Sequence, residues 1–392
     1  MFKEIKTLLI RFFTSLELTV VLLVMSIILV FVATLAQVNL GIWEVQQKYF
    51  HSFFVMWHPT GGGFSLPIFP GGYLIGGFLF VNLVAAHIYR FAFKWRRLGI
   101  IIAHLGLIVL LVGELLTGIW QKEYQMQLAP GETKSYAESF TNFELAVIDT
   151  TDPKVDHVVA IPTSMLAKDK AIQVPSLPFQ IVARAYYPNS VLRMRTDADK
   201  GQPSLANVGI GPQVLATDAP LTYKPDETNT PAAFVELIGP DHSLGTYLVS
   251  SQLGMPQSFT YDGHNYTIAL RVERRYMPFS LTLKSLHHDV YPGSDIPKNF
   301  SSIVRLRSAD GKEDRIVRIY MNNPLRYGGL TFYQYQMNSA GAGFSVLQVV
   351  RNPSWLLPYI SCLMLAVGLL IHFTIMLFGF VRKRRAPAAA AR

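Results

Sequence analysis

The chain has 392 residues, of which 50% are hydrophobic and only 16% are charged, and its mean hydropathy is +0.27. An ordinary soluble domain carries about 25% charged residues, so this composition indicates a membrane protein. The formal net charge of +9 does not indicate a nucleic-acid partner, because residues 121–352 hold 22 basic and 22 acidic residues and are neutral. The surplus comes from the other 13 basic and 4 acidic residues. All of those basic residues except Lys48 flank hydrophobic runs, as expected for charges that set membrane topology.

The single cysteine, Cys362, lies inside an apolar run. One cysteine excludes a disulfide framework, a CxxC redox centre and a cysteine-based metal cluster within this chain. We therefore interpret Cys362 as a small buried hydrophobic residue.

Residues 1–15 form a short basic segment before the first hydrophobic run. Lys3, Lys6 and Arg11 supply its charge, and residues 16–36 are apolar enough to cross a bilayer as a helix. A cleaved signal peptide also has a basic start and an apolar run, but this run is long for one. We expect a retained first span.

Residues 37–70 should form an extracytoplasmic loop. The segment is rich in aromatic side chains, which are frequent at membrane interfaces. Three consecutive glycines at 61–63, together with Pro67 and Pro70, argue against a helix in this loop.

Two further spans are expected at 71–93 and 98–120. The basic loop 94–97 separates them, and by the positive-inside rule it lies in the cytoplasm.

The character of the chain changes at residue 121. Between 121 and 352, short alternating runs such as YQMQL at 124–128 are separated by Gly, Pro, Asn and Asp, which predicts a β-rich domain. The segment 302–321 should be a hairpin whose loop contains Asp310 and Gly311.

The fourth span is expected at 355–380, followed by a basic cytoplasmic tail at 381–392. The predicted fold is a membrane protein with four transmembrane α-helices and a large extracytoplasmic β-rich domain between the third and fourth. The basic flanks predict that both termini lie in the cytoplasm and that the β domain faces a periplasm or an equivalent compartment.

Three histidines lie in three different spans: His87, His104 and His372. Counted from the nearest basic flank at about 1.5 Å per residue, they lie roughly 5, 10 and 15 Å from the cytoplasmic charges. Ionisable groups at membrane depth are costly, and an imidazole there could ligate an iron-bearing macrocycle. Alternatively, each histidine could simply hydrogen-bond a neighbouring helix, and His87 could be an interfacial residue.

Other polar residues are weaker candidates for function. Glu114, in the outer third of the third span, could carry a proton, pair with a partner subunit, or be a neutral hydrogen-bonded side chain. His287, His288 and the segment from Asp289 to Asp295 could bind a metal, although a turn at 292–293 explains them equally well. The sequence contains no nucleophile–base constellation, phosphate loop or HExxH motif, so a self-sufficient hydrolase is not indicated.

Several phrases resemble the ResB (CcsB) family, the membrane subunit of the system II cytochrome c maturation machinery. They are SLELTVVLL in the first span, AHLGLIVLLVGELLTG in the third, FSLTLKSLHHDVYPGSDIPKNFSS at 279–302 and MNNPLRYGGLTFYQ at 321–334. The resemblance extends over essentially the whole chain, including the order of spans and β domain. We expect the last phrase to build a turn and a strand of that domain, with direct contact to haem as the alternative.

The resemblance implies that this protein pairs with a ResC/CcsA-type membrane partner. Together the two would carry haem b outward and attach it covalently to the CxxCH thiols of apocytochrome c. Haem b would be a transported substrate, and thioredoxin-like reductants would keep the thiols reduced. His104 matches the family's third-span histidine, an axial haem ligand whose opposite ligand comes from the partner. His87 and His372 match no ligand position. The five tryptophans are scattered, so the tryptophan-rich segment of the partner is absent and the chain should be non-catalytic alone.

Two other classes of protein remain possible from the residues. A non-haem scaffold or an export-permease subunit could also combine four spans with a chaperone-like outer domain, although such permeases often place that domain between the first two spans. A signal-relaying sensor is a weaker alternative, because the predicted cytoplasmic tail is only a dozen residues long.

Overall fold

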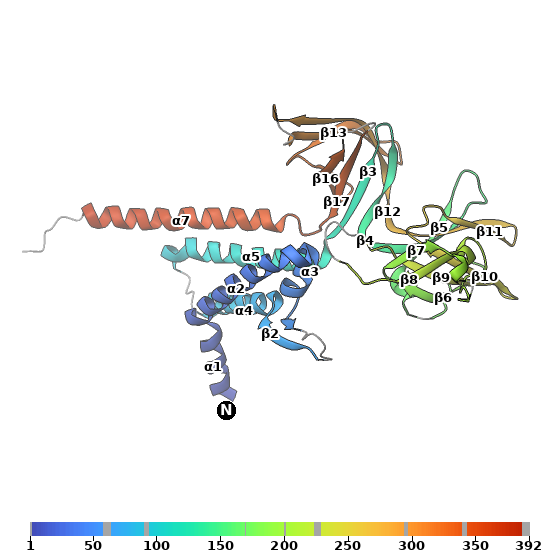
Figure 1. Ribbon diagram of the computed structural model, residues 1–392. Helices are drawn as coiled ribbons and strands as arrows, with labels where there is room; N and C mark the ends of the chain where they lie inside the picture. Colours follow the sequence, from blue (N-terminus) through green and yellow to red (C-terminus); the bar gives the residue numbers. More distant parts are fainter. Residues whose placement is uncertain are drawn as a thin grey trace, which may run out of the picture. The chain divides into compact units, whose positions relative to one another are not determined.

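The computed structural model describes residues 2–57, 64–89, 94–168, 170–199, 201–222, 229–293, 297–338 and 343–385 (Figure 1). Contacts within the chain define two units. The helical unit contains Met1–Gln121 and Asn352–Arg392, and the β unit contains Lys122–Thr222 and Thr228–Arg351. Each unit is described by itself.

The helical unit contains four helices that are long and apolar enough to cross a membrane. They are α2 (Leu16–Leu40), α4 (Gly72–Tyr89), α5 (Leu98–Trp120) and α7 (Leu357–Arg385). The prediction of four spans with a β-rich region between the third and fourth is confirmed. The second predicted span extends into residues 90–93, which lie outside the described residues.

Two parts of the helical unit differ from the sequence-based expectation. Residues 1–15, predicted only as a basic segment, contain the helix α1 (Phe2–Phe13). The predicted loop 37–70 is more ordered than expected. It holds the end of α2, the helical turns α3 (Ile42–Val45) and η1 (Gln46–Phe50), and a hairpin of β1 (Phe54–Trp57) and β2 (Leu66–Pro70). The prolines 67 and 70 lie in an edge strand, where a missing N–H is tolerated.

The β unit is built almost entirely from antiparallel strands. Its elements are β3 (Lys122–Leu128), β4 (Thr133–Asp149), β5 (His157–Pro162), α6 (Thr163–Leu166), β6 (Gln180–Tyr187), β7 (Ser190–Met194), β8 (Val214–Asp218), β9 (Ala232–Ile238), β10 (Ser243–Ser250), β11 (Gln257–Tyr261), β12 (His264–Val290), β13 (Pro297–Ser308), β14 (Asp314–Tyr320), β15 (Leu325–Tyr327), β16 (Leu330–Asn338) and β17 (Phe344–Arg351).

The largest sheet has the strand order β14-β13-β12-β4-β3-β17-β16-β15, with β11 attached to β12 and β5 to β4. A three-stranded sheet, β10-β9-β6, packs against one part of it. The predicted hairpin is confirmed as β13 and β14, which pair in antiparallel register with Arg307 opposite Asp314. The two ends of the large sheet meet at the turn after β14, where Tyr320 and Asn323 exchange backbone hydrogen bonds of 3.3 and 3.0 Å.

The strand β12 joins the two main cores of the β unit. Ile268, near its start, belongs to the core shared with the three-stranded sheet, and Leu281 belongs to the core of the larger sheet. Both side chains are buried because alternate residues of each half face inward. The register with β4 shifts between Val272 and Arg274 and again after Tyr276, so the strand bends between the parts that contribute to the two cores.

The phrase at 321–334 forms the short strand β15, a tight turn and the strand β16. Gly328 and Gly329 have φ values of 58° and 72°, a left-handed conformation that glycine adopts without steric cost. A Cβ atom at position 328 would lie 2.9 Å from the ring of Phe279, so this turn also needs glycine for space. The predicted turn and strand are confirmed.

Candidate functional site

The helices α5 and α7 run antiparallel with their backbones in close contact. Gly99, Gly106 and Gly113, spaced seven residues apart, are buried on the α5 face that meets α7. A Cβ atom at Gly99 would lie 2.4 Å from the backbone nitrogen of His372, and one at Gly113 would lie 2.9 Å from Cβ of Leu357. Small residues permit such close approach between membrane helices. This contact fixes the rotation of α5 about its own axis.

That rotation directs His104 away from α7. Five residues separate it from Gly99, which turns its side chain by about 140° from the glycine face. The Nδ1 atom of His104 lies 2.8 Å from the backbone oxygen of Ile100. Because a carbonyl oxygen can only accept, Nδ1 carries the proton, and the neutral ring then has its lone pair on Nε2. This is the tautomer that can ligate a metal through Nε2.

His87 lies in the last turn of α4 and is half-buried. His104 on α5 lies near enough to interact with it electrostatically. The structure therefore brings two of the three predicted histidines together, from the consecutive helices α4 and α5.

His372 differs from the other two. Its backbone packs against Gly99, five residues before His104, so it lies roughly 7.5 Å nearer the start of α5 than His104 does. Counting from the basic flanks had placed His372 deepest. That order is wrong, because α7 remains helical to Arg385 and its basic residues lie beyond the start of α5. Within the described chain, the buried Nδ1 of His372 has no hydrogen-bond partner.

Glu114 is exposed on α5. Ten residues separate it from His104, which places the two side chains about 80° apart around the helix. Leu107 and Leu111 lie between them and are exposed as well. One face of α5 therefore carries the imidazole of His104, the carboxyl group of Glu114 and the two leucines between them.

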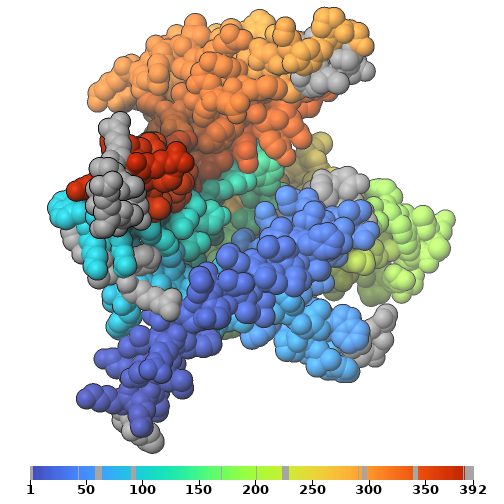
Figure 2. Space-filling model, turned by 90° about the vertical axis from the view of Figure 1, so that its left-hand side faces the viewer, coloured from blue at the N-terminus to red at the C-terminus, as the bar shows by residue number. Residues whose placement is uncertain are grey.

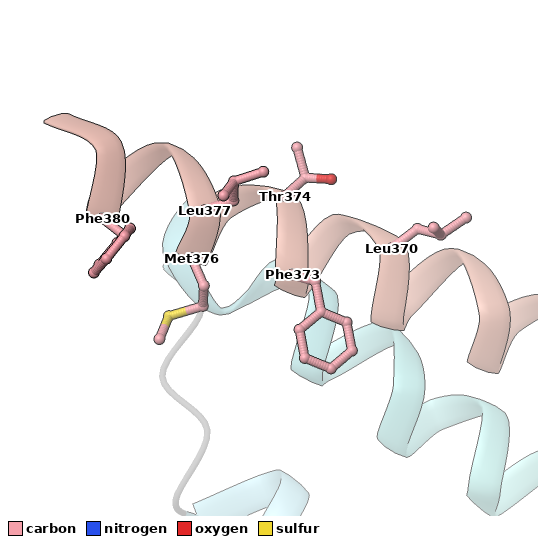
Figure 3. A pocket seen from close by; sticks show the side chains of 6 residues that line it. All are labelled: Leu370, Phe373, Thr374, Met376, Leu377 and Phe380. Carbon is pink, nitrogen blue, oxygen red and sulfur yellow. The ribbon is translucent and has the colours of Figure 1, made fainter.

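The outward side of α7 is apolar. A shallow hollow on this helix is lined by Leu370, Phe373, Thr374, Met376, Leu377 and Phe380 (Figure 3). None of the three histidines contributes to it, so the hollow is not part of the candidate site. Cys362, interpreted from the sequence as buried, is exposed instead, because the α7 face that meets α5 consists of other residues.

Asn82 in α4 is a polar residue that the sequence-based search did not consider. Its amide group donates to the backbone oxygens of Phe13 and Ser15, at 2.9 and 3.1 Å, and its carbonyl accepts from Thr19 Oγ1 at 2.7 Å. It therefore ties α1 and α2 to α4 five residues before His87. The rule that singled out the histidines, a polar side chain within an apolar run, would also have found Asn82.

The predicted metal residues of the β unit do not converge. His287 and His288 are consecutive in β12 and point to opposite faces. The ring of His288 stacks on Phe300 with centroids 4.6 Å apart, and Nε2 of His287 lies 3.4 Å from Ser285 Oγ. The described residues contain no group of three or more potential metal ligands, and Asp295 lies outside them. The turn that the sequence offered as the alternative is present at 292–293.

Comparison with known proteins places the similarity in the β unit. The model of the ResB-like family matches residues 245–343, which begin within β10 and end just before β17. Protein NrfI of Wolinella succinogenes is 36% identical over 96 residues, which are 24% of this chain and 10% of NrfI. The two phrases at 279–302 and 321–334 fall inside the family match, whereas His104 lies outside it. Within the β unit, residues 245–343 are therefore similar to the ResB-like family.

Proposed function

We propose that this chain is a subunit of the system II cytochrome c synthase, which moves haem b across the membrane and attaches it to apocytochrome c. The match of residues 245–343 to the ResB-like family supports a role in cytochrome c biogenesis in general. The 2.8 Å contact between His104 Nδ1 and the Ile100 backbone oxygen is the observation that carries the more specific proposal. The Ile100 carbonyl holds the ring so that Nε2 offers the lone pair required of an axial ligand.

In this proposal His104 supplies one axial ligand and a ResC/CcsA-type partner supplies the other. The face of α5 that bears His104 and Glu114 would meet that partner. A carboxyl group in a membrane span is costly unless it faces a donor or water, so Glu114 is expected to face a polar group of the partner. His87, beside His104, would tune the charge around the substrate, and His372 would not ligate it.

The β unit has a positioning role in this scheme. It would hold the partner's outer loops and apocytochrome c so that the CxxCH thiols, kept reduced by thioredoxin-like proteins, meet the haem. No catalytic residue of this chain is required, because such an arrangement acts through proximity. The protein would lie in a bacterial inner membrane with both termini in the cytoplasm and the β unit outside. The basic residues at the start of α5 and the end of α7 support this orientation.

The test is the haem content of the complex purified from membranes with its ResC-like partner. We expect His104→Ala to lose most of the haem absorbance per complex while the partner still co-purifies. His372→Ala is the matched control, a histidine of the same unit that should leave the absorbance unchanged. Equal haem in wild type and His104→Ala would exclude His104 as a ligand. A haem-free wild-type complex would instead favour the non-haem scaffold.

A further inference from the structure

The helix α1 has no part in the proposed haem site, yet its two sides differ sharply. Ile5, Leu8, Leu9 and Phe12 lie on one side and are 48%, 69%, 50% and 49% exposed. At 100° per residue, Lys3, Lys6, Thr7 and Arg11 fall on the other side. An exposed apolar stripe of this kind indicates that lipid or another protein covers it.

The end of α1 is fixed to the membrane helices. Asn82 of α4 donates hydrogen bonds to the backbone oxygens of Phe13 and Ser15, and the ring of Phe13 stacks on Phe78 with centroids 5.9 Å apart. Ser15 then caps α2 by accepting from the Leu18 N–H at 3.0 Å. These contacts therefore hold the turn between α1 and α2 in one conformation.

This turn sets the direction of α1. The helix runs across the direction of α5 and α7 (Figure 1), and it stands out from the other helices of its unit (Figure 2). If α5 and α7 cross the bilayer, a helix that runs across them lies along the membrane plane.

We propose that α1 is a membrane-surface helix that binds anionic lipid. Its apolar side enters the boundary between headgroups and acyl chains, and Lys3, Lys6 and Arg11 face the lipid phosphates. The position of the apolar side of α1 next to a membrane span favours lipid over a protein partner. The apolar side of α1 is followed directly by exposed apolar residues of α2, Leu16 and Val20, which lie in the bilayer. Because Asn82 joins this turn to α4, lipid binding by α1 would also hold the last turns of α4 at a defined depth.

The test uses the full-length protein in vesicles, with Cys362→Ser and a single fluorescent label at either Leu9→Cys or Thr7→Cys. These two exposed positions lie about 160° apart on α1, one on each side. In vesicles that contain phosphatidylglycerol, spin-labelled lipid should quench the label at 9 several-fold more than the label at 7. Aqueous iodide should show the reverse order.

Charge reversal tests the lipid class. The triple variant K3E/K6E/R11E should reduce quenching at position 9 by spin-labelled lipid in phosphatidylglycerol vesicles and leave it unchanged in pure phosphatidylcholine. Two results would overturn the proposal. Equal access of iodide to both labels would place α1 in water, and protection of position 9 from both quenchers would show that protein covers it. This test does not involve haem and is independent of the proposed function.

Discussion

At the scale of single residues, Asn82 is the polar group on which the helical unit depends most. It is 4% exposed, and its three hydrogen bonds reach α1, α2 and the turn between them. Removing the amide leaves the part-buried backbone oxygen of Phe13 without this donor. A lost partner of this kind costs about 1–3 kcal/mol.

We predict that Asn82→Leu lowers the stability of the purified protein by about that amount, observed as a lower midpoint of thermal unfolding in detergent. Thr34→Val is the control, because Thr34 is exposed and its hydroxyl bonds only to Val30 of its own helix. An Asn82→Leu variant as stable as the control would contradict a structural role for this amide.

At the scale of elements, the contact between α5 and α7 leaves no room for side chains at its glycines. Gly99→Ala would place a methyl group 2.4 Å from a backbone nitrogen of α7, so the two helices must separate. Overpacking of this kind costs about 1–3 kcal/mol. The same substitution at Gly118, another α5 glycine, meets no atom within 4 Å.

We predict that Gly99→Ala weakens association of α5 with α7 and Gly118→Ala does not. The midpoint of thermal unfolding in detergent should fall for Gly99→Ala and stay unchanged for Gly118→Ala. Because the α7 contact orients His104, the haem content of the complex should fall in parallel. Equal midpoints for the two variants would show that the contact between α5 and α7 at Gly99 can open to accept a methyl group without loss of stability.

The hairpin of β13 and β14 carries a pH-dependent contact. Asp314 accepts two hydrogen bonds of 2.6 Å from Arg305 and weaker ones from Arg307. The Arg305 guanidinium is the main cause that lowers the pKa of Asp314 to about 2. The ordinary carboxyl pKa in an unfolded chain is about 3.9. The contact therefore stabilises the fold above about pH 4, and its contribution disappears as the pH falls towards 2.

We predict that Asp314→Asn flattens the pH dependence of unfolding between about pH 4 and pH 2, while Asp241→Asn serves as control. Both carboxyls lie at the surface of the β unit, so added salt should reduce the difference. The measurement is the midpoint of unfolding at each pH, at low and high salt. An unchanged pH profile in Asp314→Asn would assign the acid sensitivity to other groups.

At the scale of the whole molecule, β12 is one of two strands, with β4, that contribute to both main cores of the β unit. Its first half pairs with β4 and β11, its second half with β13, and the two halves contribute to different cores. The residues matched by the ResB-like family include this whole strand. The family match in this chain therefore includes a strand that joins the two cores.

The sequence alone determined the number of spans, the β-rich character of residues 121–352 and the hairpin of β13 and β14. These features depend on local hydropathy, alternation and turn residues, which act over a few neighbours in the chain. The bounds of α5 are the expected 98–120, because two arginines precede an uninterrupted apolar run.

Only the tertiary structure decided the remaining features. Residue counting could not give the position of His372 along α5. That position depends on the register between α5 and α7, which the close contacts at the α5 glycines set. The contacts of Asn82 join residues more than sixty positions apart, and the exposure of Cys362 depends on which side of α7 meets α5. The separation of His287 from His288 follows from strand geometry once β12 is known to be extended. In each case the outcome depends on rotation or register between elements, which hydropathy does not encode.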